Sequence, residues 1–371
     1  MKFLTKVLKY LLVLVVVLVA GIAIFVNTAP QFGAAAEGTR LARMKASPEY
    51  REGAFVNLIP TSMDMSAGQV GETLEEFITA KNTRPDQPLP VDFADKVPPS
   101  DSLLHITWFG HSAVLLELEG KRILLDPMLG PAASPVPFFA QRFAYRAPID
   151  MAQFTNIDAV VISHDHYDHL DYGSIQKLDA QVGHFYVPLG VGAHLERWGV
   201  DSTKITELDW WQSVEAEGIT FTATPARHFS GRGLTDRNST LWASWVVQGR
   251  KNKVYFSGDS GYGPHFKQIG ARYGPFDLAM MECGQYNEKW KAIHMMPEQT
   301  MQAFLDLKGK VLLPIHWGAF NLAVHPWTES VERLNRANRT NVFIATPIIG
   351  TRYPVATHPP TQRWWEPLVA E

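Results

Sequence analysis

The feature that most constrains the fold of this chain is a group of titratable side chains that directly follows an apolar segment. Residues 157–163 read IDAVVIS, which is β-branched and apolar enough for a strand buried on both faces. The next residues, 164–169, read HDHYDH. In open α/β folds, ligands bind beyond the carboxyl ends of such strands. Because leaving so many buried polar groups without partners costs several kcal/mol, we expect a ligand to satisfy them.

The composition of this cluster indicates a metal site, since imidazole nitrogens and carboxylate oxygens together bind transition metals. In a loop that leaves a strand, His164 and His166 can point the same way. Asp168 and His169 lie in the following turn and can serve a second ion. The competing interpretation is a polar turn whose histidines bond to the backbone, which we would favour for a lone histidine but not for this cluster.

Two ions need more ligands than one loop provides, and three further candidates stand at the ends of apolar runs. His228 follows ITFTATPAR, Asp259 ends VYFSGD, and His316 ends KVLLPIH. Each residue alone could cap a turn or a helix. Together with the first cluster they predict a dinuclear metal site.

A weak internal repeat predicts the architecture. Residues 111–127 and 242–260 each read as a strand, a turn and a second strand, and these second strands end near Asp126 and Asp259. A helical segment follows in each half, one of them beginning at Pro297. Two similar halves predict an α/β fold in which two sheets pack face to face with helices outside.

These motifs resemble the metallo-β-lactamase superfamily of dinuclear metal hydrolases over roughly residues 103–353. The segments SHDHYDHLD, PARHFSGRGLTDRNSTLWASW, FSGDSGY and IHWGAF are similar to the N-acyl-phosphatidylethanolamine phospholipase D group and its bacterial relatives. The resemblance implies an αββα sandwich. It also implies one zinc ion on His164, His166 and His228, a second on Asp168, His169 and His316, and Asp259 between them. Manganese or iron could occupy the same ligands.

The chemistry expected of such a site is hydrolysis by a metal-bridging hydroxide, because metal coordination lowers the pKa of water. The resemblance implies that phosphatidic acid and an N-acylethanolamine are the products. Asp168 could orient the hydroxide. We expect His294 to protonate the leaving group, although a histidine bonded near a helix start is an equally plain interpretation. His111 and Asp126 are expected to support the ligands rather than bind metal.

The amino terminus predicts a membrane anchor over residues 1–29. Three lysines precede the apolar run from Tyr10 to Val26, which as a helix spans roughly 25 Å. The lysines place the amino terminus in the cytoplasm, so the body would face the periplasm from a bacterial inner membrane. The alternative is a cleaved signal peptide, whose best small-residue site, 34–36, lies well past the run.

The rest of the chain divides into a lead-in over residues 30–102, with a short helix near 71–82, and a hydrolase body over residues 103–371. With 34 basic and 37 acidic residues and no long basic run, the chain gives little support for nucleic-acid binding. The single cysteine, Cys283, can form neither an internal disulfide nor a thiolate site alone. Oligomeric state is not indicated.

The substrate is the least constrained feature. The apolar loop over residues 134–148 and several tryptophans could line a groove for a lipid, or belong to the core. Arg142 and Arg146 could meet a phosphate or be ordinary surface residues. The alternatives to lipid phosphodiester hydrolysis are a hydrolase of the same fold acting on a lactone or β-lactam, and a metal-holding envelope protein without turnover. The histidines without a spacing argument are His105, His184, His194, His265, His325 and His358.

Overall fold

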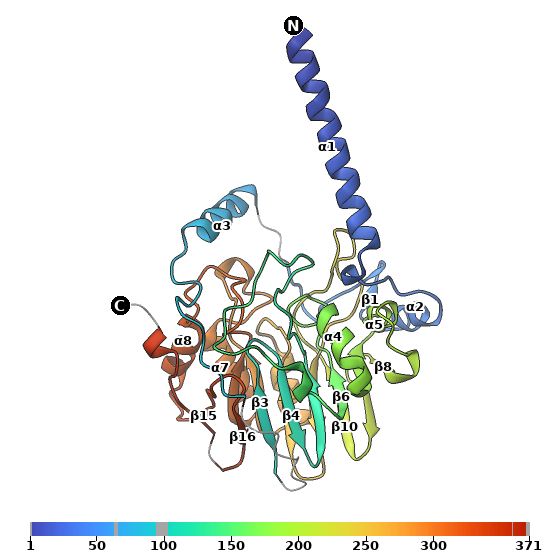
Figure 1. The fold of residues 1–371 in the computed structure, drawn as a ribbon. Helices are drawn as coiled ribbons and strands as arrows, with labels where there is room; N and C mark the ends of the chain where they lie inside the picture. The colour runs from blue at the N-terminus through green and yellow to red at the C-terminus, as the bar shows by residue number, and fades with distance from the viewer. Residues whose placement is uncertain (1, 63–65, 94–102, 358, 369–371) are drawn as a thin grey trace.

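The computed structural model of the chain describes residues 2–62, 66–93, 103–357 and 359–368 (Figure 1). Two seven-stranded sheets form its centre. In spatial order, the first sheet contains β16 (Arg352–Pro354), β3 (His105–Trp108), β4 (Val114–Leu118), β5 (Lys121–Leu125), β6 (Ile157–Val161), β7 (Val182–Pro188) and β8 (Ile205–Leu208). The second contains β15 (Phe343–Ile344), β14 (Gly309–Ile315), β13 (Phe276–Glu282), β12 (Lys253–Phe256), β11 (Ser244–Gln248), β10 (Ile219–Thr224) and β9 (Ser213–Ala216).

The two sheets share one pairing pattern. In the first, the neighbours from β16 to β5 are antiparallel and those from β5 to β8 are parallel. In the second, the neighbours from β9 to β12 are antiparallel and those from β12 to β15 are parallel. The repeat predicted from the two hairpins therefore extends over both sheets.

The core lies between the sheets, and side-chain alternation along the strands explains it. On β4, Val114, Leu116 and Leu118 belong to the large hydrophobic cluster shared by the two sheets. Leu115, which points to the opposite face, belongs to a second cluster with residues of the outer helices. Both faces of this sheet are therefore covered, as expected for apolar strands that contain parallel pairs.

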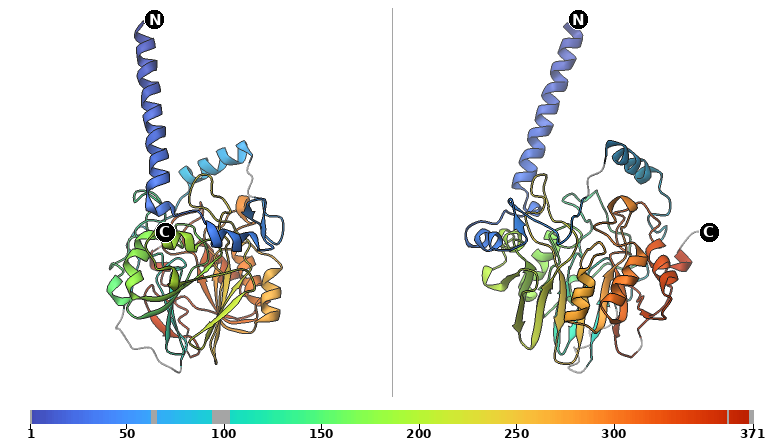
Figure 2. Two further views of the ribbon diagram at one scale, coloured as in Figure 1. Left: turned by 90° about the vertical axis from the view of Figure 1, so that its right-hand side faces the viewer. Right: turned by 180° about the vertical axis from the view of Figure 1, so that it is seen from behind.

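The helices lie outside the sheets (Figures 1 and 2). The first sheet is covered by α4 (Tyr172–Leu178) and α5 (Gly192–Arg197), and the second by α6 (His265–Arg272), α7 (Pro297–Asp306) and α8 (Glu329–Ala337). The short 3-10 helices are η1 (Pro30–Phe32), η2 (Met151–Gln153), η3 (Asp179–Gln181), η4 (Ser202–Lys204), η5 (Glu288–Trp290) and η6 (Glu366–Leu368). The predicted αββα arrangement is confirmed.

Strand register brings the ends of several strands to one edge of the molecule. Leu125 pairs with Val161 at the ends of β5 and β6. Glu282 pairs with Ile315 at the ends of β13 and β14. The loops after these strands meet, because Asp259 and His316 of the second sheet both lie near the loop after β6 of the first, at the edge where open α/β sheets bind their ligands.

The amino-terminal helix α1 (Lys2–Thr28) projects from the body in all three views, and α3 (Ala67–Thr79) lies toward the same end (Figures 1 and 2). In α1, the span from Phe3 to Thr28 is long and apolar enough to cross a membrane, and none of this span is buried. The helix predicted near 71–82 spans Ala67–Thr79 instead. It begins earlier because Ser66 caps it by accepting a hydrogen bond from the Gln69 backbone N–H, and it ends three residues earlier, before Ala80.

The lead-in also contributes α2 (Gly38–Lys45) and a small hairpin of β1 (Tyr50–Arg51) and β2 (Ala54–Phe55). Met44 and Phe55 are buried in the same cluster as the two sheets. The domain boundary at residue 103 stays a prediction, but part of the preceding chain packs into the core of the body.

Candidate metal centre

The loop after β6 forms a tight turn that presents its side chains at the strand-end edge. The backbone N–H groups of His169 and Leu170 both donate to the carbonyl of His166, at 3.1 and 2.8 Å. We call residues 164–170 the metal loop. Not every polar residue of this loop faces the other ligand candidates. Asp165 points away, accepting hydrogen bonds from the Thr240 hydroxyl and the Gly231 N–H, both at 2.8 Å.

The first set of ligand candidates, here the three-histidine group, contains His164, His166 and His228. His166 Nδ1 lies 2.8 Å from His164 Nε2 and 3.2 Å from His228 Nε2. His164 and His166 come from the first sheet, whereas His228 comes from the loop after β10 of the second. Three imidazole nitrogens so close together match the donor set of a transition-metal site.

The second set, here the carboxylate group, contains Asp168, His169 and His316. Asp168 Oδ2 lies 3.2 Å from His316 Nε2 and 3.4 Å from His169 Nε2. His316 follows β14 of the second sheet, so this group is also assembled from both halves of the molecule.

Asp259 lies between the two groups. Its Oδ2 is 3.1 Å from His169 Nε2 and 3.1 Å from His316 Nε2. The same oxygen is 3.8 Å from the Nε2 atoms of His164 and His228. Its other oxygen, Oδ1, is buried without a hydrogen-bond partner. A buried carboxylate oxygen without a protein partner is a position that a cation would satisfy, so the residues fit a metal centre.

The ring nitrogens on the far side of several histidines are held in place. His169 Nδ1 lies 2.7 Å from Asp126 Oδ2, and His164 Nδ1 lies 2.9 Å from the Ser163 hydroxyl. His228 Nδ1 lies 3.0 Å from the carbonyl of Ile293. Such contacts fix the orientation of a metal-binding ring. Asp126 lies beneath the ligand candidates, where the sequence placed it.

His111 supports Asp168 from the loop between β3 and β4. Its Nε2 lies 2.9 Å from Asp168 Oδ2, and its backbone N–H donates to the carbonyl of Trp317 at 2.7 Å. The His316 N–H in turn donates to the His111 carbonyl at 3.0 Å. His111 therefore ties together Asp168 and the loop after β14.

Glu282 was missed by the sequence analysis. It is the last residue of β13 and is fully buried, with Oε2 3.2 Å from His294 Nδ1 and 3.7 Å from His316 Nδ1. The sequence does mark this position, because Glu282 stands at the end of an apolar strand, just as Asp259 follows the apolar strand β12. The His294 ring stacks on that of His316 at a centroid distance of 5.1 Å. The same ring lies 5.0 Å from that of His228, so the residue predicted to donate a proton borders both groups.

Electrostatics distinguish the two groups. Burial lowers the pKa of His164 and of His228 well below the usual value for histidine. Burial would also lower the pKa of His316, but Asp259 and Asp168 outweigh it and raise that pKa to about 10. The pKa of His169 is raised for the same reason. The negative potential that retains protons on these two rings also favours a bound cation.

Other residues that the sequence analysis considered have structural contacts. Arg142 donates to the carbonyls of Met128 and Gly130, at 2.6 and 2.9 Å, which occupies its guanidinium. Arg146 is exposed. Of the tryptophans considered for a lipid groove, Trp210, Trp242 and Trp245 are buried in the core, whereas Trp211 and Trp290 are half-buried. Among the remaining histidines, His194 contacts Asp165 and His265 contacts the Ser260 hydroxyl, whereas His358 lies outside the described residues.

Comparison with known proteins identifies the family of the chain. Residues 121–317 match the family described as "Beta-lactamase superfamily domain". The chain belongs to the beta-lactamase superfamily. An uncharacterised superfamily relative from Mycobacterium tuberculosis (strain H37Rv) is 44% identical over 350 residues, which cover 91% of this chain and 92% of the relative.

Two further superfamily comparisons concern activity and fold. The N-acyl-phosphatidylethanolamine-hydrolyzing phospholipase D 1 of Caenorhabditis elegans is 36% identical over 234 residues, covering 60% of this chain and 65% of the relative. A metallo hydrolase of Ignicoccus hospitalis superposes with a TM-score of 0.52 at 21% identity, covering 68% of this chain and 98% of that chain. The latter shows the fold alone. Together with the family match, these findings support a metal-dependent hydrolase of the metallo-β-lactamase fold.

Proposed function

We propose that the chain is a membrane-anchored dinuclear metal-dependent phosphodiesterase that cleaves N-acyl-phosphatidylethanolamine-like lipids in the manner of a phospholipase D. The observation that carries the proposal is the position of Asp259 between two groups of ligand candidates. The three-histidine group would hold one ion and the carboxylate group the other, with zinc the best fit to nitrogen and oxygen donors and manganese or iron possible. Two bound ions would supply a water-derived nucleophile at neutral pH and offset phosphate charge.

The residues of the chain have separate roles in this proposal. Asp168, held by His111, orients the attacking group besides binding metal. His294 has Nδ1 engaged by Glu282, so we assign Nε2 to proton donation toward the leaving oxygen. The phospholipase D named in C. elegans supports phosphorus as the reacting atom.

Exposed apolar side chains near the base of α1 and on α3 support a lipid substrate. Phe138 and Phe139 are 78% and 69% exposed. Their loop lies against the base of α1, because Gln31 Nε2 donates to the Pro135 carbonyl at 2.9 Å. Side chains one and two turns apart on α3 are also exposed and apolar: Val70, Leu74, Phe77 and Ile78.

The position of α3 connects this apolar stripe to the centre. Lys289 of η5 lies 2.9 Å from Glu76 of α3, and η5 leads directly to His294. An apolar stripe of this kind suits the interface of a bilayer. With the lysines before the apolar run of α1, it supports a body that faces the periplasm at the inner membrane.

The test is hydrolysis by the detergent-purified full-length chain loaded with zinc. We expect N-acylethanolamine and phosphatidic acid from vesicles containing N-acyl-phosphatidylethanolamine, measured by mass spectrometry. His164→Ala serves as the matched control and is expected to lose the ion of the three-histidine group and, with it, product formation. Opening of a lactone or β-lactam while the phospholipid persists would establish the alternative hydrolase. Bound metal without turnover of any of these would establish the metal-holding protein.

The apolar stripe gives this test a second comparison. The double variant Leu74→Ser with Ile78→Ser is expected to hydrolyse vesicle lipid several-fold more slowly than the wild type, and the same lipid in detergent micelles at the wild-type rate. Glu75→Gln, on the same helix, is the control and should behave as wild type on both. Equal rates for all three proteins on vesicles would remove α3 from the lipid-binding surface.

A further inference from the structure

The chain that follows α1 makes a dense set of contacts with the body. We call residues 28–34 the foot of α1. Arg197 donates to the carbonyl of Thr28 at 3.1 Å, and Trp198 Nε1 donates to the carbonyl of Pro30 at 2.6 Å. The ring of Phe32 packs edge-on against that of Tyr167, with centroids 6.3 Å apart. The foot therefore reaches the metal loop itself.

Arg232 connects the foot to the metal loop. Its side chain is buried, and its Nε donates to the carbonyl of Gln31 at 2.9 Å. Its Nη1 donates to the carbonyls of Asp165 and Leu170, near the two ends of the metal loop. The guanidinium also lies over the ring of Tyr167, 4.1 Å from its centroid. One arginine thus bonds the base of the helix and the loop that carries four ligand candidates.

His194 provides a second connection. The Ala34 N–H donates to His194 Nδ1 at 3.0 Å, so the opposite nitrogen, Nε2, faces Asp165 Oδ2 at 3.3 Å. Gly33 makes this approach possible. Its φ is +74°, and a Cβ added there would lie 2.0 Å from His194 Nδ1. No other residue fits at position 33 without moving the histidine.

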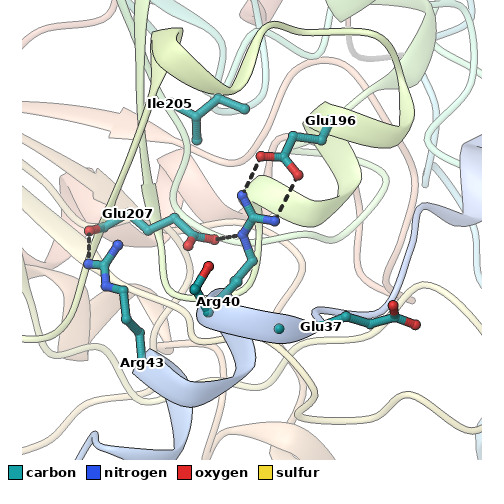
Figure 3. A pocket seen from close by; sticks show the side chains of 8 residues that line it. Glu37, Arg40, Arg43, Glu196, Ile205 and Glu207 are labelled. Carbon is teal, nitrogen blue, oxygen red and sulfur yellow. Dashed lines mark hydrogen bonds and ion pairs between the residues drawn. The ribbon is translucent and has the colours of Figure 1, made fainter.

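The chain beyond the foot is fixed to the same part of the body (Figure 3). Arg40 of α2 lies between two carboxylates, 2.8 Å from Glu196 of α5 and 2.9 Å from Glu207 of β8. Arg43, one turn further along α2, donates to the backbone carbonyl of Glu207 at 2.8 Å. The small-residue site at 34–36 lies between two segments that are each bonded to α5.

We infer that the foot is a positioning element for the metal loop and that α1 is retained in the mature protein rather than removed as a signal peptide. Cleavage after Ala36 would remove Gln31, Phe32 and Ala34 from their partners. Buried donors on Arg232 and Trp198 would lose their acceptors, which is unfavourable for the folded state. That the loop holds metal rests on the proposed function, whereas its support by the foot rests on the contacts alone.

The experiment compares Gly33→Ala with Gly38→Ala in the full-length protein. Both glycines have positive φ, +74° and +54°, but nothing lies within 4 Å of a Cβ added at Gly38. Backbone strain is therefore present in both variants, whereas only the first displaces His194. We expect Gly33→Ala to lose zinc to a chelator roughly 10–100-fold more readily than the wild type, as is typical for a lost support of a metal ligand. Gly38→Ala should retain zinc as the wild type does.

Two further measurements complete the test. Hydrogen exchange over residues 164–170 should be faster in Gly33→Ala alone, with or without metal, and the intact mass of the membrane-purified wild type should include the residues before Ala34. Phe32→Ala is the milder variant if Gly33→Ala does not fold, and a smaller change in the same direction is expected. A mass that begins after Ala36, or equal exchange in both glycine variants, would overturn the inference. If the wild type binds no zinc but Gly33→Ala still exchanges faster than the wild type and Gly38→Ala, only the proposed function is overturned.

Discussion

The three-histidine group and the carboxylate group share one loop but are stabilised in different ways. In the first, His164 rests on a hydroxyl and His228 on a backbone carbonyl, which are neutral partners. In the second, His169 rests on the buried carboxylate of Asp126, and a further carboxylate, Asp168, belongs to the group itself. Burial lowers the pKa of His164 and of His228, whereas at His169 the surrounding carboxylates together outweigh burial and raise the pKa.

The two groups of ligand candidates are therefore held together by different physical effects. The three-histidine group depends on the geometry with which three uncharged rings converge. The carboxylate group depends on negative charge concentrated away from water, where electrostatic interactions are strong. Substitutions that remove charge at constant shape should therefore weaken metal binding more in the carboxylate group than in the three-histidine group.

The largest expected effect is that of Asp259→Ala, because this residue contacts both groups and its loss should affect them together. We expect the variant to lose both ions and to hydrolyse lipid more than roughly 100-fold more slowly, beyond the effect of losing an outer partner. Metal per chain by mass spectrometry and kcat/KM measure this. Asp259→Asn keeps the shape of the side chain but not its charge, and should lose nearly as much metal as Asp259→Ala. An alanine variant that keeps both ions would contradict the central position of Asp259.

His294→Gln tests the chemistry at the border of the two groups. We expect unchanged metal content and a kcat on lipid lower by roughly 10²–10⁴-fold, the usual contribution of a general acid. An activated aryl phosphodiester, whose leaving group needs no proton, should be hydrolysed at nearly the wild-type rate. If both substrates slow equally, His294 does not act by donating a proton.

His166→Ala and His316→Ala test the two groups separately, since each removes one ligand candidate from one group. Each variant is expected to bind one ion instead of two, and zinc titration followed by calorimetry should show one binding step in place of two. His105→Ala, outside both groups, is the control. Loss of both steps in His166→Ala would mean that the groups are not separable.

The smallest expected effects come from the residues beneath the ligands. Asp126→Asn removes a charge under His169 and should weaken the ion of the carboxylate group by about 10–100-fold. Ser163→Ala removes a neutral partner of His164 together with one hydrogen bond to Asp126, and should weaken the ion of the three-histidine group less than Asp126→Asn weakens the other. Chelator competition followed by metal analysis compares the two variants. A larger loss of metal affinity in Ser163→Ala than in Asp126→Asn would contradict the view that charge supports the carboxylate group and geometry the three-histidine group.

Much of this arrangement could be predicted because the sequence marks strand ends. An apolar run followed by a polar residue placed His164, Asp259 and His316, and the repeated hairpins predicted the two sheets. Glu282 obeys the same rule but is a single glutamate among residues with no other motif, so the pattern did not separate it from a surface residue.

The supporting contacts could not be predicted from local pattern. Arg232 reaches a carbonyl at Gln31, and His194 receives the N–H of Ala34, across separations of well over a hundred residues. Nothing near either residue in the chain indicates such a partner. These contacts depend on how the lead-in folds back over the body, which is decided by tertiary packing.

The way in which the first sheet is completed has a consequence for biosynthesis. Its outer strand, β16, pairs with β3, so that Arg352 to Pro354 lie beside residues near the start of the body. His316 likewise arrives only after most of the chain has been made. A polypeptide still emerging from the ribosome has neither, so the proposed site stays incomplete until nearly the whole chain has been made.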